Sequence, residues 1–230
     1  MKEPRGADEP LVVVERGDGR SGELALLRRG GELRIVCNGA FVIASSNERS
    51  SRALIAAARP YLPDRPLDVL IGGLGMGYAL DEALDLPDVH RVTVAEYEPL
   101  IVRWFTRHMR ERAARAERDA RSRIVVADVD DLLAPGRYDL IALDTDNGPQ
   151  WLLRADNARL YDAGGLRRVA RALRPDGVVV FWSPERYESF ERALAEIFGA
   201  VSAVPATDVV DGRALEYTMY VGRAPRAADG

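Results

Sequence analysis

The sequence has very few of the residues that build disulfides and metal centres. It contains one cysteine, Cys37, and two histidines, His90 and His108. A single cysteine excludes an internal disulfide and a cysteine-rich zinc site. Two histidines that stand near no orienting motif are too few for a histidine-based metal centre. We therefore expect function without a metal.

Long apolar runs are also missing. No stretch approaches the roughly 18–20 uncharged apolar residues that a membrane-spanning helix needs. The polar start MKEPRGADEP lacks the apolar centre of a signal peptide. The sequence thus predicts a cytoplasmic protein that does not enter a membrane.

The composition is that of an ordinary globular protein. Of the 230 residues, 47% are hydrophobic and 30% charged, which excludes disorder across the whole chain. A sequence pI near 5.4 argues against a nucleic-acid binder. The segment Arg107–Arg123 is rich in arginine, and two interpretations stay open: a basic arm, or a solvated helix with internal ion pairs. The interspersed acidic residues favour the helix.

The character of the chain changes near the prolines at 60–66. Before them, short alternating runs are separated by turn-forming pieces such as GDGRSG and CNG, followed by a helical stretch at Glu48–Ala58. This pattern predicts a small N-terminal antiparallel β unit plus a helix over residues 1–60. A second domain is expected over 61–223, with a frayed tail at 224–230.

After the prolines, apolar strands alternate with helical stretches. The expected strands include LDVLIGG, RVTVAE, RIVVAD, YDLIALD and GVVVFWS, and the expected helices are Tyr78–Leu84, Pro99–Arg110, Ala163–Leu173 and Tyr187–Phe198. Such alternation is typical of a parallel sheet covered by helices on both faces. A closing antiparallel hairpin is expected from Ala200–Pro205 and Ala214–Val221, with its turn at Asp211-Gly212. The predicted fold is α/β, with a Rossmann-like, mostly parallel, seven-stranded sheet.

The first of these strands runs directly into a glycine-rich turn. The segment LDVLIGGLGMG places Gly72, Gly73, Gly75 and Gly77 between the strand and the next helix. Glycines let the backbone turn sharply and let a ligand approach where a Cβ would stand. The helix N-terminus behind them favours a polar or anionic group. The turn alone is weak evidence for a ligand site.

Acidic residues at the ends of the following strands strengthen the evidence for a ligand site. Glu96 ends the second strand, Asp128 follows the third, and Asp144 and Asp146 follow the fourth. The carboxyl ends of parallel strands meet at one edge of the sheet, so these side chains describe one crevice. Glu96 suits the ribose hydroxyls and Asp128 an adenine amino group. The G-x-G-x-G spacing differs from the G-x-G-x-x-G of dinucleotide enzymes and favours S-adenosylmethionine or a relative of it.

Taken in order, these motifs resemble the spermidine synthase-like (polyamine aminopropyltransferase) family of the class I methyltransferase fold. The resemblance runs from about Leu11 to Val221. IGGLGMG stands at the family's glycine-rich loop, AEYE at its ribose-binding Glu, and ADV, which is Asp128 with Val129, at its adenine-binding Asp. YDLIALDTDNGP stands at its active-site Asp loop.

The resemblance implies a transferase that alkylates a small amine and works as a homodimer. It implies S-adenosylmethionine, its decarboxylated form or methylthioadenosine as the ligand. The family's loop carries an Asp where this chain has Gly75. An Asp there would repel the carboxylate of intact S-adenosylmethionine, so Gly75 slightly favours methyl transfer. Two alternatives stay open: aminopropyl transfer from the decarboxylated donor, and a non-catalytic nucleoside-binding homologue.

We expect Asp144, or else Asp146, to orient and deprotonate the acceptor. Tyr78, just past the glycine turn, and Trp151, after the Asp loop, are candidates for the walls of the acceptor pocket. Arg52 falls near the position of a Tyr-His pair that shapes the polyamine pocket in the family. A cationic Arg52 there would disfavour a diamine.

Overall fold

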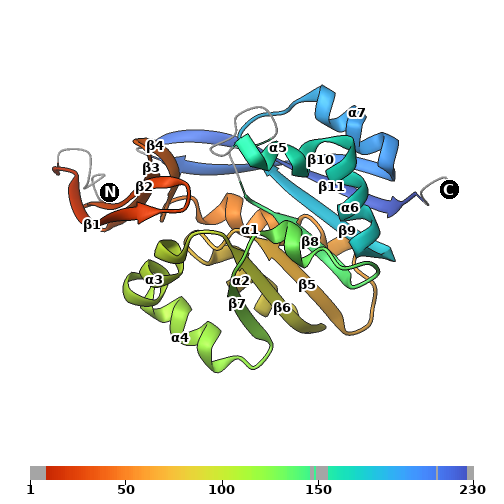
Figure 1. Cartoon of the computed structure of the whole chain (residues 1–230), viewed down its shortest axis with the longest axis horizontal. Helices are drawn as coiled ribbons and strands as arrows, with labels where there is room; N and C mark the ends of the chain where they lie inside the picture. Colours follow the sequence, from red (N-terminus) through yellow and green to blue (C-terminus); the bar gives the residue numbers. More distant parts are fainter. Residues whose placement is uncertain (1–8, 146–147, 149–154, 211, 227–230) are drawn as a thin grey trace, which may run out of the picture.

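The computed structural model describes residues 9–145, 148, 155–210 and 212–226. Its N-terminal part is a four-stranded antiparallel sheet with the strands in sequence order. The strands are β1 (Val12–Gly19), β2 (Gly22–Arg29), β3 (Glu32–Cys37) and β4 (Ala40–Ala44). The sheet lies at the left end of the molecule in Figure 1. The expected small antiparallel β unit is therefore confirmed.

The larger sheet has seven strands in the order β10-β11-β9-β8-β5-β6-β7. Its parallel strands pair β5 with β6 and β8, β6 with β7, and β8 with β9. β10 and β11 form the expected antiparallel hairpin at one edge. The bounds are β5 (Leu67–Gly72), β6 (Val89–Glu96), β7 (Ser122–Val126), β8 (Tyr138–Leu143), β9 (Leu173–Ser183), β10 (Phe198–Val210) and β11 (Arg213–Pro225). The predicted Rossmann-like sheet is confirmed. β11 runs into the stretch expected as a tail, and residues 227–230 lie outside the described residues.

Helices cover both faces of this sheet, as Figure 1 shows. One hydrophobic cluster holds buried residues of α1 to α4, and a second holds those of α5 to α7. Central strands such as β8, buried along their whole length, separate the two clusters. The helices are α1 (Glu48–Ala56), α2 (Tyr78–Leu84), α3 (Pro99–His108), α4 (Arg110–Arg118), α5 (Ala158–Tyr161), α6 (Ala163–Ala172) and α7 (Glu188–Ile197); the short 3-10 turns are η1 (Arg59–Tyr61), η2 (Val129–Leu132) and η3 (Ala155–Asn157). None of the described helices is long and apolar enough to cross a membrane.

Helix α1 connects the two sheets. It packs against α2, β9 and β10, with Leu54 and Ile55 fully buried. Its N-terminal amides are held from the far end of the chain, because the Asp208 carboxylate of β10 accepts from the amides of Arg49 at 2.9 Å and Ser50 at 3.1 Å. The helix thus belongs by its packing to the larger sheet, although we expected it with the N-terminal unit.

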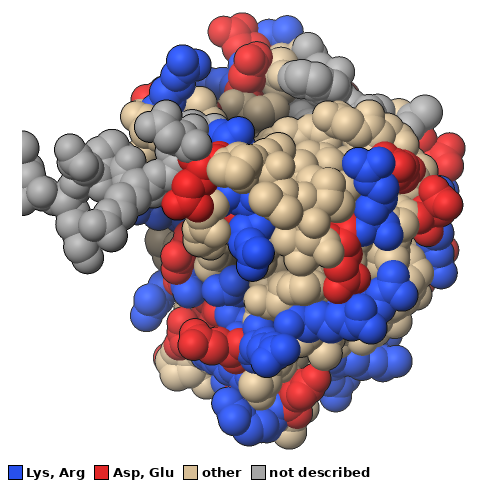
Figure 2. All heavy atoms as spheres, turned by 90° about the vertical axis from the view of Figure 1, so that its left-hand side faces the viewer, with Lys and Arg blue, Asp and Glu red and all other residues tan. Residues whose placement is uncertain are grey.

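The arginine-rich segment is helical, as the second interpretation expected. The helix expected at Pro99–Arg110 is α3, which ends at His108, and after Met109 the chain continues as α4 within the arginine-rich segment. Ala113 and Ala116 of α4 are buried, and Arg115 reaches Asp85 of the neighbouring segment at 2.6 Å. Figure 2 shows arginines and acidic side chains intermixed on the face that carries the N-terminal sheet and these helices.

Candidate active site

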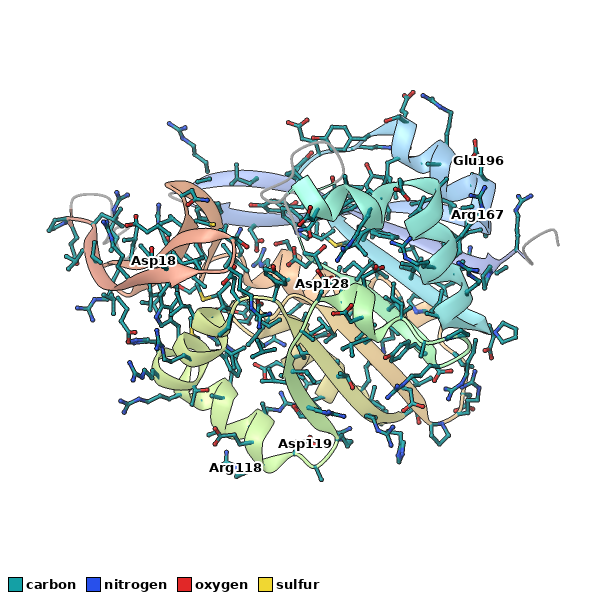
Figure 3. All side chains as sticks on the ribbon, viewed as in Figure 1. Asp18, Arg118, Asp119, Asp128, Arg167 and Glu196 are labelled. Atoms are coloured by element: carbon teal, nitrogen blue, oxygen red, sulfur yellow. The ribbon has the colours of Figure 1, made fainter. Side chains whose placement is uncertain are left out.

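The main pocket lies where the carboxyl ends of β5, β6 and β8 meet the N-terminal sheet. Its volume is about 150 Å³. Its lining comes from segments far apart in the chain: the β1–β2 hairpin, β3, β4, α1, the glycine turn, the ends of β6 to β8, β9 and β11. Asp128, labelled near the centre of the view in Figure 3, is one of the lining residues. The pocket is therefore the crevice predicted at the edge of the parallel sheet.

Two glycines of the turn line this pocket, Gly73 and Gly75. Gly73 has φ +95°, and a Cβ there would lie 2.2 Å from the backbone oxygen of Asp144. Gly75 has φ +50°, and a Cβ there would lie 3.0 Å from Cδ1 of Ile43 in β4. The backbone of Gly73 thus packs directly against the backbone of Asp144, and the apolar side chain of Ile43 lies opposite Gly75.

The other two glycines serve packing instead. A Cβ on Gly72 would lie 2.9 Å from side-chain atoms of Leu143 and Thr145. Gly77, with φ +85°, starts α2, and a Cβ there would lie 2.3 Å from the ring of Phe105. Neither residue is in the pocket lining, although both were expected to bind the cofactor.

Glu96 is buried at the end of β6 and faces the glycine turn. Its carboxylate accepts from the amide of Leu74 at 2.9 Å and from that of Glu98 at 2.8 Å. Burial is the main cause that raises the pKa of Glu96, and these amide bonds oppose it. A carboxylate has about four lone-pair sites, so Glu96 still has acceptor capacity toward the pocket.

Asp128 follows β7 and caps η2, accepting from the amide of Asp130 at 3.1 Å. Its other oxygen accepts from Arg159 of α5 at 2.7 Å. Asp128 and Val129 both line the pocket, and Leu160 lies beside them in the lining. We expected the Asp128 carboxylate to meet an adenine amino group. It is held by Arg159, which the sequence analysis did not name.

Asp144 follows β8 and lines the pocket. Its amide donates to the carbonyl of Gly72 at 2.9 Å, which continues the strand pairing by one residue. Burial raises the pKa of Asp144 to about 7, and the nearby charge of Glu96 adds to the shift. A carboxyl group with a pKa near neutrality, facing a pocket, has the properties of a general base.

Glu98 is a buried carboxylate that the sequence analysis did not assign. It lines the pocket and accepts from the amides of Arg20 at 2.8 Å and Ser21 at 2.6 Å in the β1–β2 hairpin. Burial raises the pKa of the nearby Cys37 thiol, and the charge of Glu98 adds to the shift. Glu98 thus holds the β1–β2 hairpin of the N-terminal sheet against the end of β6. The AEYE motif contained it, but only the contact with the hairpin gives it a role.

Three further lining residues were also missed: Asn47, Trp182 and Tyr217. The rings of Trp182 and Tyr217 lie 5.1 Å apart at an interplanar angle of 35°. The Asn47 amide group donates to the Tyr217 hydroxyl at 2.9 Å. These residues belong to α1's leading loop, β9 and β11, and no local sequence pattern joins them.

Two residues expected to wall the acceptor pocket lie outside its lining. The Tyr78 hydroxyl donates to the Ser45 carbonyl at 2.8 Å, and the Arg112 guanidinium lies 4.2 Å from the centre of the Tyr78 ring. Arg52 turns away toward Glu48 at 2.9 Å and Glu82 at 3.2 Å. The predicted Asp146 and Trp151 lie outside the described residues.

The pocket is acidic. Four carboxylates line it, from Glu96, Glu98, Asp128 and Asp144, and no Lys or Arg is among the described lining residues. Within the described part of the chain, no group of three or more metal-ligating side chains is found. Such a lining favours a ligand with positive charge. Together with the glycine turn, it forms a candidate ligand site at the carboxyl edge of a Rossmann-like sheet.

Comparisons with known proteins agree with this class. No protein-family model matches the chain. A polyamine aminopropyltransferase of Mycobacterium tuberculosis is 26% identical over 191 residues, 79% of this chain and 35% of that protein. Another, of Pyrobaculum neutrophilum, is 28% identical over 166 residues, 67% of this chain and 56% of that protein. The chain thus spans between about a third and just over half the length of these relatives.

The fold has solved counterparts. The spermidine synthase structure from Thermotoga maritima aligns with a TM-score of 0.75 at 16% identity, over 92% of this chain and 72% of that one. A spermidine synthase in complex with the transition-state analogue AdoDATO aligns equally well. The resemblance to the spermidine synthase-like family is therefore confirmed: this chain has the family's fold and is similar in sequence to its polyamine aminopropyltransferases.

Proposed function

We propose that this protein is an aminopropyltransferase that uses decarboxylated S-adenosylmethionine to alkylate a small amine. The observation that carries the proposal is the charge of the pocket, four carboxylates without a described Lys or Arg. A donor with a sulfonium and an ammonium gains from these carboxylates. Intact S-adenosylmethionine would add a carboxylate for which the described lining holds no cationic partner.

The glycine turn supports the same choice of donor. Amides of such a turn are the usual alternative partners for a carboxylate. Here the Leu74 amide already donates to Glu96 at 2.9 Å, and Ile43 lies opposite Gly75. The comparisons also favour aminopropyl over methyl transfer, because the relatives are named polyamine aminopropyltransferases. The absence of the family's Asp at Gly75 slightly favoured methyl transfer. The four carboxylates of the lining favour the decarboxylated donor more strongly.

The chain's own residues suit each part of such a reaction. Glu96 has acceptor capacity for ribose hydroxyls, and Gly73 and Gly75 line the pocket beside it. The donor supplies an alkyl carbon whose bond to sulfur breaks as the bond to the amine nitrogen forms, leaving a neutral thioether. Asp144 orients the amine and accepts the proton that it loses.

Calorimetry with the wild-type protein tests the donor assignment. We expect decarboxylated S-adenosylmethionine to bind at least about tenfold more tightly than intact S-adenosylmethionine, a difference of about 1.4 kcal/mol. Methylthioadenosine, which lacks the charges, is the reference for the nucleoside part. Tighter binding of intact S-adenosylmethionine would support methyl transfer instead. If none of the three compounds bound, the assignment of a nucleoside site would be wrong.

The non-catalytic alternative makes a different prediction. A homologue that retains only the fold would bind methylthioadenosine and release no product with any amine. The division into a β unit over 1–60 and a catalytic domain over 61–223, the homodimer and the cytoplasmic location remain part of this proposal, supported by the resemblance. Light scattering during size-exclusion chromatography tests the dimer.

A further inference from the structure

The Asp128 carboxylate is held by donors from two different elements. One oxygen accepts from the amide of Asp130 in η2 at 3.1 Å, and the other accepts from the Arg159 guanidinium of α5 at 2.7 Å. The Asp128 side chain is 13% exposed and lines the pocket, whereas that of Arg159 is 44% exposed and is not among the described lining residues. Arg159 therefore acts on a bound ligand through Asp128 and not by direct contact.

Arg159 is itself held in place. Its guanidinium lies 3.8 Å from the Asp130 carboxylate, and its backbone carbonyl accepts from Arg168 of α6 at 3.1 Å. Arg168 also donates to the Asp130 carboxylate at 3.0 Å. Two arginines and two aspartates thus tie η2 to α5 and α6. Since hydrogen bonds between charged groups are the strong ones, the direction of the Asp128 carboxylate is set before a ligand binds.

Apolar side chains lie beside Asp128 in the lining. Val129 and Leu160 line the pocket and belong to one hydrophobic cluster. Glu96 is adjacent, because its backbone carbonyl accepts from the amide of Ala127 at 3.0 Å. Glu96, Asp128, Val129 and Leu160 are called the nucleoside end below. The apolar side chains suit the faces of a purine ring, and the Asp128 carboxylate suits a hydrogen-bond donor on its edge.

A carboxylate held in one direction distinguishes between purines. An ionised carboxylate only accepts hydrogen bonds. Adenine has an amino group at C6, which donates, whereas hypoxanthine has an oxygen at C6, which accepts. A fixed carboxylate therefore favours adenine and repels hypoxanthine. A carboxylate that can turn aside loses much of this selectivity, because it avoids the opposing oxygen.

We infer that Arg159 is a positioning residue that makes the site selective for adenine over hypoxanthine, by holding the Asp128 carboxylate toward the edge of the base. This inference rests on the proposed function, which supplies an adenine nucleoside as the ligand. It gives a role to an arginine that lies outside the pocket lining.

Two uncharged nucleosides test the inference. Methylthioadenosine and methylthioinosine differ at C6 of the base and in the proton at the adjoining N1. Calorimetry with the wild-type protein should show at least about tenfold tighter binding of methylthioadenosine. Because neither compound carries a charge, removal of an arginine does not act on them through the net charge of the pocket. Equal binding of the two by the wild type would overturn the inference.

Arg159→Met removes the guanidinium and keeps a side chain of apolar carbons. A partly exposed ion pair adds little to folding stability, so this variant should fold with an unfolding midpoint close to that of the wild type. We expect its selectivity for methylthioadenosine to fall at least about fivefold. A merely structural role would shift α5 and Leu160 and weaken both nucleosides equally. Unchanged selectivity in this variant would overturn the inference.

Two further arginine variants make the test specific. Arg167→Met removes the same group from an exposed position of α6 (Figure 3) and should leave both dissociation constants within about twofold of the wild type. Arg159→Lys keeps a charged donor without the planar fork and should recover part of the selectivity. An equal loss of selectivity in Arg167→Met and Arg159→Met would contradict the assignment of Arg159.

A double variant shows whether Arg159 acts through Asp128. An asparagine side chain both donates and accepts, so Asp128→Asn alone should remove most of the selectivity. Adding Arg159→Met to Asp128→Asn should then lower it no further, because the two residues belong to one interaction. A further loss in the double variant would exclude positioning through Asp128.

The readouts also separate this inference from the proposed function. Selective binding that depends on Arg159, without product from any amine, contradicts aminopropyl transfer and supports the inference. Product formation with unchanged selectivity in Arg159→Met supports the transferase and overturns the inference. Binding of neither nucleoside contradicts both.

Discussion

Replacing Asp144 with asparagine should lower kcat/KM by at least about 100-fold, the contribution expected of a positioned general base. Asparagine keeps the size of the side chain and can still contact an amine, but it cannot accept the amine's proton. Binding of methylthioadenosine should change little, because Glu96 and Asp128 mark the nucleoside end. Steady-state kinetics with the decarboxylated donor measure the first effect, and calorimetry measures the second.

The pH profile should identify the same group. Because burial raises the pKa of Asp144 to about 7, its carboxylate form, and with it kcat/KM, should increase as pH rises through about 7. A cationic donor lowers the pKa of a nearby carboxyl, so the corresponding limb of kcat should lie at lower pH. This limb should vanish in Asp144→Asn and persist in Asp176→Asn, which changes an exposed carboxylate. A limb unchanged in Asp144→Asn would exclude Asp144 as the base.

Asp144 should also destabilise the folded protein at neutral pH. Its pKa is about 7 in the folded state and 3.8 in the reference state, so the folded protein keeps a proton that the unfolded chain loses. The free energy of unfolding therefore falls as pH rises from about 4 to 7 and is constant above. Asp144→Asn should remove this cost, about 4 kcal/mol at pH 8, and have little effect at pH 3. Urea unfolding at both pH values tests this.

The second large effect concerns the glycine turn. Gly77→Ala should destabilise the protein by about 3 kcal/mol, or prevent folding. At φ +85° an alanine is strained by about 1–2 kcal/mol, and its Cβ would lie 2.3 Å from the buried Phe105 ring, which adds about 1–3 kcal/mol of overpacking. The loss should appear in the midpoint of thermal or urea unfolding.

Gly136→Ala is the matched control. Gly136 has φ +61°, but a Cβ there would meet nothing within 4 Å. It should show the conformational strain alone, about 1–2 kcal/mol. If both variants lost the same stability, contact with Phe105 would not be the reason for a glycine at position 77.

The elements that sequence patterns predicted share one property: their signals are local. Apolar strands alternating with helices required a parallel sheet, and parallel strands bring their carboxyl ends together, so Glu96, Asp128 and Asp144 were found without a structure. Helix α3 was predicted in the same way, and it ends at His108, two residues before the expected Arg110.

The pocket walls could not be predicted in the same way. Tyr78 stands beside the glycine turn, yet its ring points toward Arg112 and its hydroxyl toward Ser45. Asn47 and Tyr217 are joined by a hydrogen bond across 170 residues of sequence. The direction of a side chain from a helix, and the meeting of two distant segments, depend on how whole elements pack.

The order of the motifs determined from sequence alone the class of fold and the edge of the sheet at which the candidate site lies. These properties follow from residue chemistry and from the geometry of parallel strands. Only the tertiary structure decided the charge of the pocket and which distant segments form its walls. It does so by placing β4, α1, β9 and β11 around Asp144, and their contacts are made between residues that no local pattern connects.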